Sequence, residues 1–228
     1  IKMAPVVLAL AADPRFESRV CVTAQHRQML DQVLHLFGIT PDRDLDVMRP
    51  GQDLFDVTAR VLLAMRDLIR EERPDLVLVQ GDTTTCFAAA LAAFYENVPV
   101  GHVEAGLRTG NLRAPFPEEA NRAMVSRIAS LHFAPTEWSR QNLLREGIPD
   151  AAIHVTGNTV IDALLMVRDK VLAADPARWR DQFGDEIFGR ITDPARRMIL
   201  VTGHRRENFG QGFVDLCKAI RDLARAHR

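Results

Sequence analysis

Short β-rich apolar segments alternate along this chain with longer segments that repeat apolar residues at helical spacing. Strands are predicted at residues 19–23, 75–79, 98–103, 153–156 and 198–202, with a further one at 131–134. Helices are predicted at residues 26–37, 54–70, 84–96, 118–130, 137–146, 159–173 and 212–226. Such alternation is typical of stacked β-α units. The predicted fold class is therefore α/β, with a Rossmann-like parallel sheet flanked by helices.

The segment 174–197 separates two parts of the chain. It is rich in Asp, Arg and Pro and has little sustained periodicity, so a domain boundary is predicted before it. Residues 1–156 are expected to form a Rossmann-like domain, and residues 157–228 a linker helix with the start of a second domain. One strand, one motif loop and one helix cannot cover a sheet on both faces. We therefore expect the second domain to be cut off at Arg228.

Composition excludes several classes of function. With 29 basic and 30 acidic residues the net charge is -1, which gives no electrostatic basis for a nucleic-acid or membrane-surface partner. No apolar run is long enough to span a bilayer, and no leader sequence is recognised. The distant, odd-numbered cysteines Cys21, Cys86 and Cys217 favour a reducing compartment over disulfides or a zinc site. A cytoplasmic location and no metal are predicted.

Polar clusters follow four of the predicted strands, at residues 80–82, 102–106, 156–158 and 203–208. In open α/β sheets, ligands bind in the crevice beyond the carboxyl ends of the strands. The four clusters therefore predict one shared site.

The first two clusters contain three candidate residues. Asp82 precedes three threonines, and it either has a function or only caps a helix. Glu104 follows an apolar run and has no obvious cap to make, so a functional role is favoured. His102 is interpreted as a satisfied core imidazole.

A predicted helix opens after Pro117. Acidic residues in its first turn complement the helix dipole, but capping requires only one of Glu118 and Glu119. Arg108 and Arg113 lie on the preceding loop. Their guanidinium groups either bind a phosphate or pair with the two glutamates, and the sequence leaves both open.

Residues 203–208 (GHRREN) end a predicted strand, and a glycine-containing helix start follows them. Backbone amides, the helix dipole and two guanidinium groups would converge there and could bind a diphosphate. A solvated basic turn is the alternative. The glycines at 210 and 212 lack the third glycine of a dinucleotide fingerprint, so no nicotinamide cofactor is expected.

Five motifs in fixed order resemble the bacterial non-hydrolysing UDP-N-acetylglucosamine 2-epimerases. They are residues 80–85 (QGDTTT), 101–109 (GHVEAGLRT), 117–122 (PEEANR), 156–159 (TGNT) and 202–208 (TGHRREN). The resemblance covers nearly the whole chain, although the family's chain is considerably longer. It implies two Rossmann-like domains in the glycosyltransferase-B arrangement, with a UDP-sugar between them. It also implies that a first strand is missing before Ile1, that residues 1–10 continue the first helix, and that this fragment alone is inactive.

The reaction of the family explains why its active site needs carboxylates. The C2 proton of the sugar has no adjacent carbonyl, so the family eliminates UDP to give 2-acetamidoglucal and re-adds it after protonation on the other face. This route needs acid and base groups on both faces of C2 and stabilisation of the leaving UDP. The resemblance makes Asp82, Glu104 and Glu118 the acid/base set and His204 the partner of the leaving diphosphate.

Further assignments come from the same resemblance. The residues implied in substrate binding or in the electrostatics of the site are Lys2, Arg108, Arg205 and Asn158. Bacterial members are homodimers that also bind a second UDP-N-acetylglucosamine as an allosteric activator. Gln25 and Gln28 are carried over to that activator site, or they only cap the following helix. Some members place an Arg near the position of Gly51, so this chain departs from them there.

Three other functions remain open. A glycosyltransferase of the same architecture would need an acceptor cleft, because fold alone does not determine the reaction. A hydrolysing relative would release free N-acetylmannosamine, and a nucleotide-sugar sensor would have no need of the matched carboxylates. A nicotinamide-dependent sugar epimerase is disfavoured, because Tyr95 is followed by Pro99 and not by the lysine of a Tyr-x-x-x-Lys pair.

Overall fold

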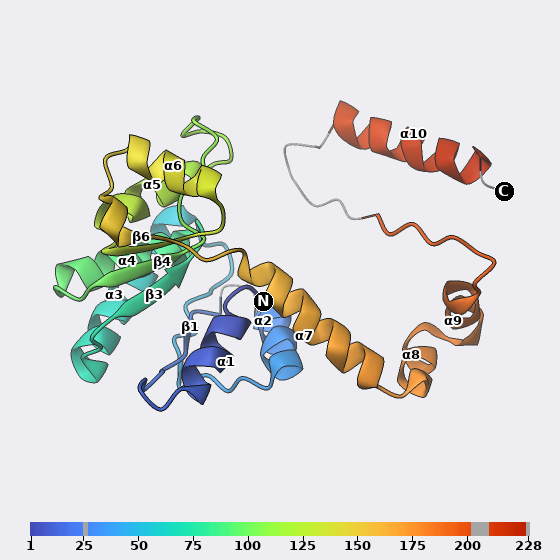
Figure 1. Cartoon of the computed structure of the whole chain (residues 1–228), viewed down its shortest axis with the longest axis horizontal. Helices are drawn as coiled ribbons and strands as arrows, with labels where there is room; N and C mark the ends of the chain where they lie inside the picture. The colour runs from blue at the N-terminus through green and yellow to red at the C-terminus, as the bar shows by residue number, and fades with distance from the viewer. Residues whose placement is uncertain (25–26, 202–209, 227–228) are drawn as a thin grey trace. The chain divides into compact units, whose positions relative to one another are not determined.

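The computed structural model describes residues 1–24, 27–201 and 210–226 (Figure 1). By their internal contacts the residues form two units, Ile1–Ala173 and Ala174–Arg228. Helix α7 (Thr159–Ala173) belongs to the first unit, because Ala163 is buried together with Ala4 and Phe37. The predicted domain division at 156/157 stays a prediction about the intact protein.

A four-stranded parallel sheet forms the centre of the first unit (Figure 1). Its strands are, in spatial order, β3 (Val77–Gln80), β4 (Val100–Val103), β5 (Leu131–Ala134) and β6 (Ile153–Val155). A separate parallel pair is formed by β1 (Cys21–Val22) and β2 (Arg43–Asp44). Because neighbouring strands of the larger sheet are parallel, all four end at the same edge. The predicted α/β class with a Rossmann-like parallel sheet is confirmed.

Helices connect the strands of the first unit. Besides α7 they are α1 (Ala4–Ala12), α2 (Arg27–Phe37), α3 (Leu54–Glu72), α4 (Thr84–Tyr95), α5 (Glu118–Ile128), α6 (Glu137–Arg145) and the short 3-10 turn η1 (Asp150–Ala152). Side chains set several of their starts. The carboxylate of Asp53 accepts from the amide of Asp56 at 2.9 Å and the reciprocal bond is present, which makes a capping box at the start of α3.

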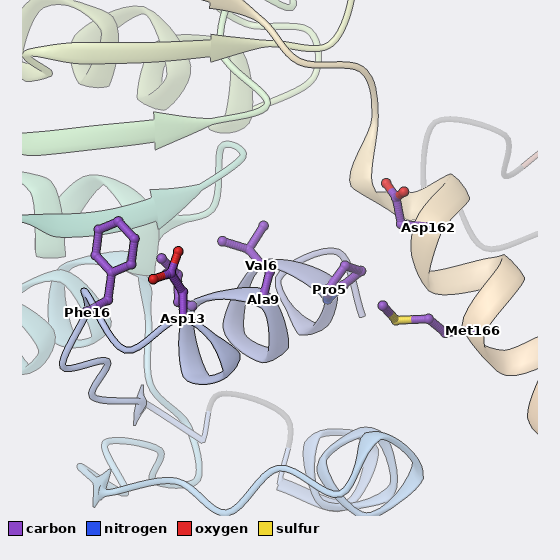
Figure 2. A pocket seen from close by; sticks show the side chains of 8 residues that line it. Pro5, Val6, Ala9, Asp13, Phe16, Asp162 and Met166 are labelled. Atoms are coloured by element: carbon purple, nitrogen blue, oxygen red, sulfur yellow. The ribbon is translucent and has the colours of Figure 1, made fainter.

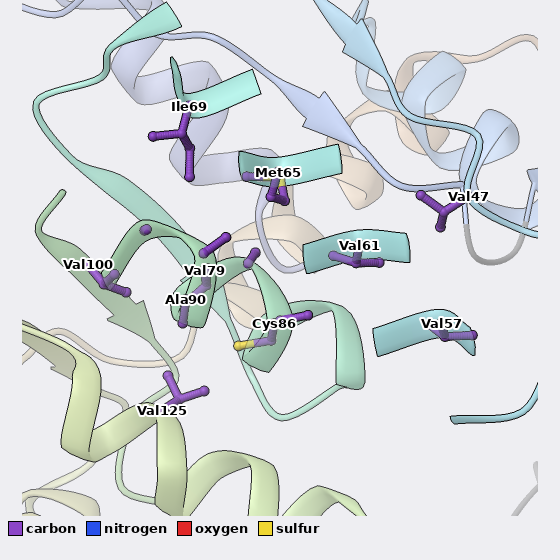
Figure 3. Close-up of a cluster of buried hydrophobic side chains, with 14 residues drawn as sticks. Val47, Val57, Val61, Met65, Ile69, Val79, Cys86, Ala90, Val100 and Val125 are labelled. Atoms are coloured by element: carbon purple, nitrogen blue, oxygen red, sulfur yellow. The ribbon is translucent and has the colours of Figure 1, made fainter. Parts of the chain in front are cut away.

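The main hydrophobic core lies between α3, α4 and the sheet (Figure 3). Val57, Val61, Met65 and Ile69 of α3 recur every four residues and form one buried face of that helix. The facing helix α4 is rich in alanine, which lets the two helices pack closely. This core supports β3 and β4, the strands whose ends carry the first two polar clusters.

The second unit differs from the sequence prediction in two ways. The segment 174–197 contains two short helices, α8 (Pro176–Phe183) and α9 (Asp185–Thr192), which are too short to show sustained periodicity. The strand predicted at 198–202 does not form over residues 198–201, whose apolar side chains are exposed. A strand needs a neighbour to pair with, and the described residues of this unit contain no other strand. The last predicted helix is present as α10 (Gln211–Ala226).

Candidate active site

Three predicted carboxylates belong to elements that end or begin at the carboxyl edge of the sheet. Asp82 lies between β3 and α4, Glu104 directly follows β4, and Glu118 opens α5. Burial raises the pKa of the Asp82 carboxyl; Arg122 opposes this rise, Glu118 and Glu104 add to it, and Lys2 opposes it. The charges of Glu118 and Glu104 therefore reach the Asp82 carboxyl.

Both oxygens of the Glu104 carboxylate have a hydrogen-bond donor. Lys2 Nζ donates to Oε1 at 2.5 Å and Gln80 Nε2 donates to Oε2 at 2.6 Å. The side chain of Glu104 is 11% exposed, so these donors replace most of its water. Glu104 also has a φ of 65°, in the left-handed region that a residue with a Cβ rarely adopts. Strain of this kind, of about 1–3 kcal/mol, clusters at functional sites.

The Asp82 side chain does not cap a helix. Thr83 is the N-cap of α4, and its Oγ1 accepts from the Cys86 amide at 3.2 Å. Asp82 instead forms an ion pair with Arg122, with 2.8 Å between Oδ2 and Nη2. The interpretation of Asp82 as only a helix cap is therefore excluded.

The structure separates the roles of two adjacent glutamates. Glu119 is buried, and its Oε1 accepts from the amides of Thr109 and Gly110, both at 2.9 Å. Glu118 is half-buried, and its carboxylate makes no hydrogen bond or ion pair to any residue that the structure describes. Glu119 is thus structural, and a role of Glu118 in the chemistry stays a prediction.

Most of the Arg108 guanidinium is engaged by the protein. Its Nε and Nη2 donate to the two carboxylate oxygens of Glu146 at 2.6 and 2.9 Å. Nη2 also donates to Ser126 Oγ at 2.8 Å, and Nη1 to the Leu107 carbonyl at 2.7 Å. Its carboxylate partner is therefore neither of the two glutamates that the sequence suggested. Substrate binding by Arg108 stays a prediction, and these four bonds leave one Nη1–H for it.

The remaining predicted residues are placed as follows. Asn158 Oδ1 accepts from the Val160 amide at 3.1 Å at the start of α7. Gln28 is exposed in the first turn of α2. Their roles with substrate and activator stay predictions. Three predicted site residues lie outside the described residues: Gln25, His204 and Arg205.

Two residues of this site were not singled out from the sequence. Gln80 binds Glu104, and Arg122 binds Asp82. Both stand inside motifs that carried the family resemblance, so the signal was their place in those motifs. The choice of partner was not visible, because each pair joins separate β-α units.

His102 is a buried core imidazole, as predicted, but among the described residues only one of its two ring nitrogens is satisfied. It is 0% exposed, its Nε2 donates to the Gly81 carbonyl at 2.8 Å, and its Nδ1 has no hydrogen-bond partner among the described residues. Burial lowers the pKa of His102 to about 4. His102 therefore stays neutral and holds the turn that precedes Asp82.

This histidine is expected to make stability fall as the pH falls from about 6.5 to about 4. In that window the unfolded chain binds the proton and the folded His102 does not, which lowers the free energy of unfolding by on the order of 3 kcal/mol. His102→Gln should flatten this dependence of the thermal midpoint on pH. His35→Gln, at an exposed histidine, serves as the control and should leave it unchanged. Equal slopes for the wild type and His102→Gln would contradict the prediction.

A groove of about 530 Å³ runs along α1 (Figure 2). Its walls include Val6, Leu10, Phe16 and Met166, which are apolar, and none of the three candidate carboxylates lines it. The acid/base chemistry is therefore not expected there. Over residues 1–24, 27–201 and 210–226, no helix combines the length and the apolar character that crossing a bilayer requires.

Known proteins resemble this chain over its whole length. The family profile described as UDP-N-acetylglucosamine 2-epimerase matches residues 8–228. The UDP-N-acetylglucosamine 2-epimerase of Escherichia coli K12 is 58% identical over 100% of this chain and 60% of its own length. The protein of that name from Neisseria meningitidis serogroup A is 50% identical over the same shares. The chain thus spans about three fifths of the length of these relatives.

Solved structures agree with the sequence relatives. The crystal structure of UDP-GlcNAc 2-epimerase from Neisseria meningitidis bound to UDP-GlcNAc has a TM-score of 0.90 and 48% identity, over 99% of this chain and 60% of that one. The enzyme from Methanocaldococcus jannaschii, in complex with UDP-GlcNAc and UDP, has a TM-score of 0.73 and 33% identity, over 80% of this chain and 50% of that one. These neighbours have the glycosyltransferase-B-like fold that the resemblance implied. From the motifs, the carboxylate site and these relatives together, the chain belongs to the UDP-N-acetylglucosamine 2-epimerase family.

Proposed function

We propose that the intact protein carrying this chain interconverts UDP-N-acetylglucosamine and UDP-N-acetylmannosamine by inverting the configuration at C2. The observation that carries this proposal is the placement of Asp82 after β3, Glu104 after β4 and Glu118 at the start of α5, where the charges of Glu118 and Glu104 raise the pKa of Asp82. The family membership supports the reaction, and a neighbour described as bound to UDP-GlcNAc supports the substrate.

The chemistry requires more than one carboxylate. One carboxylate accepts the C2 proton, and the electron pair of the C2–H bond forms the C1–C2 double bond of 2-acetamidoglucal. The C1–O bond to the diphosphate breaks, and its electron pair leaves with UDP. A second group then protonates C2 on the opposite face while the UDP oxygen re-forms the bond to C1. Lys2 and Arg122 offset the charge of Glu104 and Asp82 during this cycle. His204 and Arg205 are proposed to stabilise the leaving diphosphate.

A solvent-exchange experiment tests this route. The intact protein is incubated with UDP-N-acetylglucosamine in heavy water, and the sugar nucleotides are followed by NMR. The expected product is UDP-N-acetylmannosamine that carries deuterium at C2, because the proton added to the glucal comes from solvent. An epimer without deuterium would reject elimination and re-addition. Release of free N-acetylmannosamine would indicate a hydrolysing relative instead, and no conversion would reject the epimerase function.

The assembly and regulation of the intact protein are part of the same proposal. The family resemblance supports a homodimer and a second UDP-N-acetylglucosamine bound as an activator near Gln25 and Gln28. A cytoplasmic location is proposed as well, from the three cysteines that are far apart in the sequence. The described residue of this pair, Gln28, is exposed and so accessible to a ligand. Hyperbolic substrate-velocity curves would count against the activator.

A further inference from the structure

We propose that Arg122 is a positioning residue, and that a buried chain of contacts through it holds the three candidate carboxylates in a common geometry. This series of contacts runs from Asp82 through Arg122 and Glu119 to the loop that follows β4. This inference rests on the proposed function, because its meaning for catalysis depends on the epimerase reaction.

At the centre of this series of contacts, the buried guanidinium of Arg122 lies between two carboxylates. Arg122 is 9% exposed and Glu119 is 2% exposed. Arg122 Nη2 lies 2.8 Å from Asp82 Oδ2, and its Nε lies 3.4 Å from Glu119 Oε2. Apart from this charge contact, Glu119 Oε2 has no hydrogen-bond partner among the residues described. Arg122 thus bridges a structural carboxylate and a reacting one.

Helix α5 holds Asp82 by its backbone as well as by its side chain. Asn121 Nδ2 donates to the Asp82 carbonyl at 2.9 Å, and the next residue, Arg122, holds the carboxylate. Glu118 opens the same helix. Two contacts from one rigid helix therefore set the position of Asp82 relative to Glu118.

The other end of this series of contacts reaches the loop that begins with Glu104. Glu119 Oε1 accepts from the amides of Thr109 and Gly110, in the loop that begins after β4. Glu104 lies at the start of that loop. One buried series of charges thus links the loop after β3, the loop after β4 and the start of α5, which are the three segments that carry the carboxylates.

The geometry requires an arginine. The planar guanidinium pairs with Asp82 through Nη2, while its Nε donates to the Glu118 carbonyl at 3.4 Å and stays beside Glu119. A lysine is a single point charge on a flexible stem and cannot hold both ends in fixed directions. Arg122→Lys therefore keeps the charge and loses the geometry. Misplacement of a reacting group by about 1 Å can cost on the order of 100-fold in rate, so Arg122→Lys should lower kcat by roughly 10- to 100-fold with a smaller change in KM.

A double-mutant cycle in the intact protein, with UDP-N-acetylglucosamine as substrate, tests this inference. Arg122→Lys, Asp82→Asn and the double variant are compared by kcat, and Arg127→Lys supplies the same substitution at an exposed site on the same helix. If Arg122 acts through Asp82, Arg122→Lys should have little further effect once Asp82 is Asn. Losses that multiply independently would overturn the inference.

A pH profile separates positioning from a loss of folding. Arg122 lowers the pKa of Asp82 against the effect of burial. Arg122→Gln should therefore move the acidic limb of kcat to higher pH, and this shift should be absent in an Asp82→Asn background. A limb that stays in place would overturn the inference. Failure of the wild type to epimerise would reject the proposed function itself, which keeps the two failures distinct.

Discussion

Replacing Glu104 by glutamine in the intact protein is expected to slow turnover by roughly 10²- to 10⁴-fold, the usual contribution of one acid/base group. The substitution keeps the size of the side chain and removes its ability to exchange a proton. Lys2 can still donate to the amide oxygen, whereas the amide nitrogen cannot accept from Gln80 as Oε2 does. The steady-state rate with UDP-N-acetylglucosamine measures the effect.

The control for this variant is the same change at an exposed ion pair. Glu71 pairs with Arg43 on the surface, and Glu71→Gln should leave both turnover and thermal midpoint unchanged. A folded Glu104→Gln protein that turns over at a near-normal rate would refute the role of Glu104. Recording the thermal midpoint of both variants ensures that a loss of rate is not a loss of fold.

Gly106→Ala is expected to destabilise the first unit by roughly 3 kcal/mol or more. A Cβ at Gly106 would lie 2.2 Å from the Ser139 carbonyl oxygen and 3.1 Å from Leu143 Cγ. The first of these is backbone of α6, which cannot rotate away. The φ of 86° adds the cost of a left-handed residue. Thermal or urea unfolding of the intact protein should show a large shift of the midpoint.

A second glycine separates crowding from backbone strain. Gly147, just after α6, has a φ of 82°, and an added Cβ would meet nothing within 4 Å. Gly147→Ala should therefore cost only the backbone term, about 1–2 kcal/mol. Equal losses at the two positions would contradict the close approach of α6 to the loop after β4.

Elements with strong local signals could be predicted from the sequence. The helix at Thr159–Ala173 has the predicted bounds, because a long periodic segment marks it. The further strand predicted at Leu131–Ala134 also has these bounds, although its sequence, Leu-His-Phe-Ala, is only partly apolar. The two-residue strands β1 and β2 gave no such signal: β1 was predicted longer, and β2 was not predicted. The strand predicted at 198–202 fails over its described part because strand formation depends on a partner that local sequence does not contain.

For the candidate site, too, some features could be predicted from the sequence and others could not. The sequence by itself determined the α/β class, the edge of the sheet that carries polar residues, and the three carboxylates to consider. Only the tertiary structure decided the partner of each charged side chain. Arg108 pairs with Glu146 and Arg122 pairs with Asp82, whereas Glu119 accepts hydrogen bonds from two backbone amides. The physical reason is that secondary structure follows from local periodicity and capping. The partner of a buried charge is instead set by which segments, distant along the chain, the packed core brings within a few ångströms.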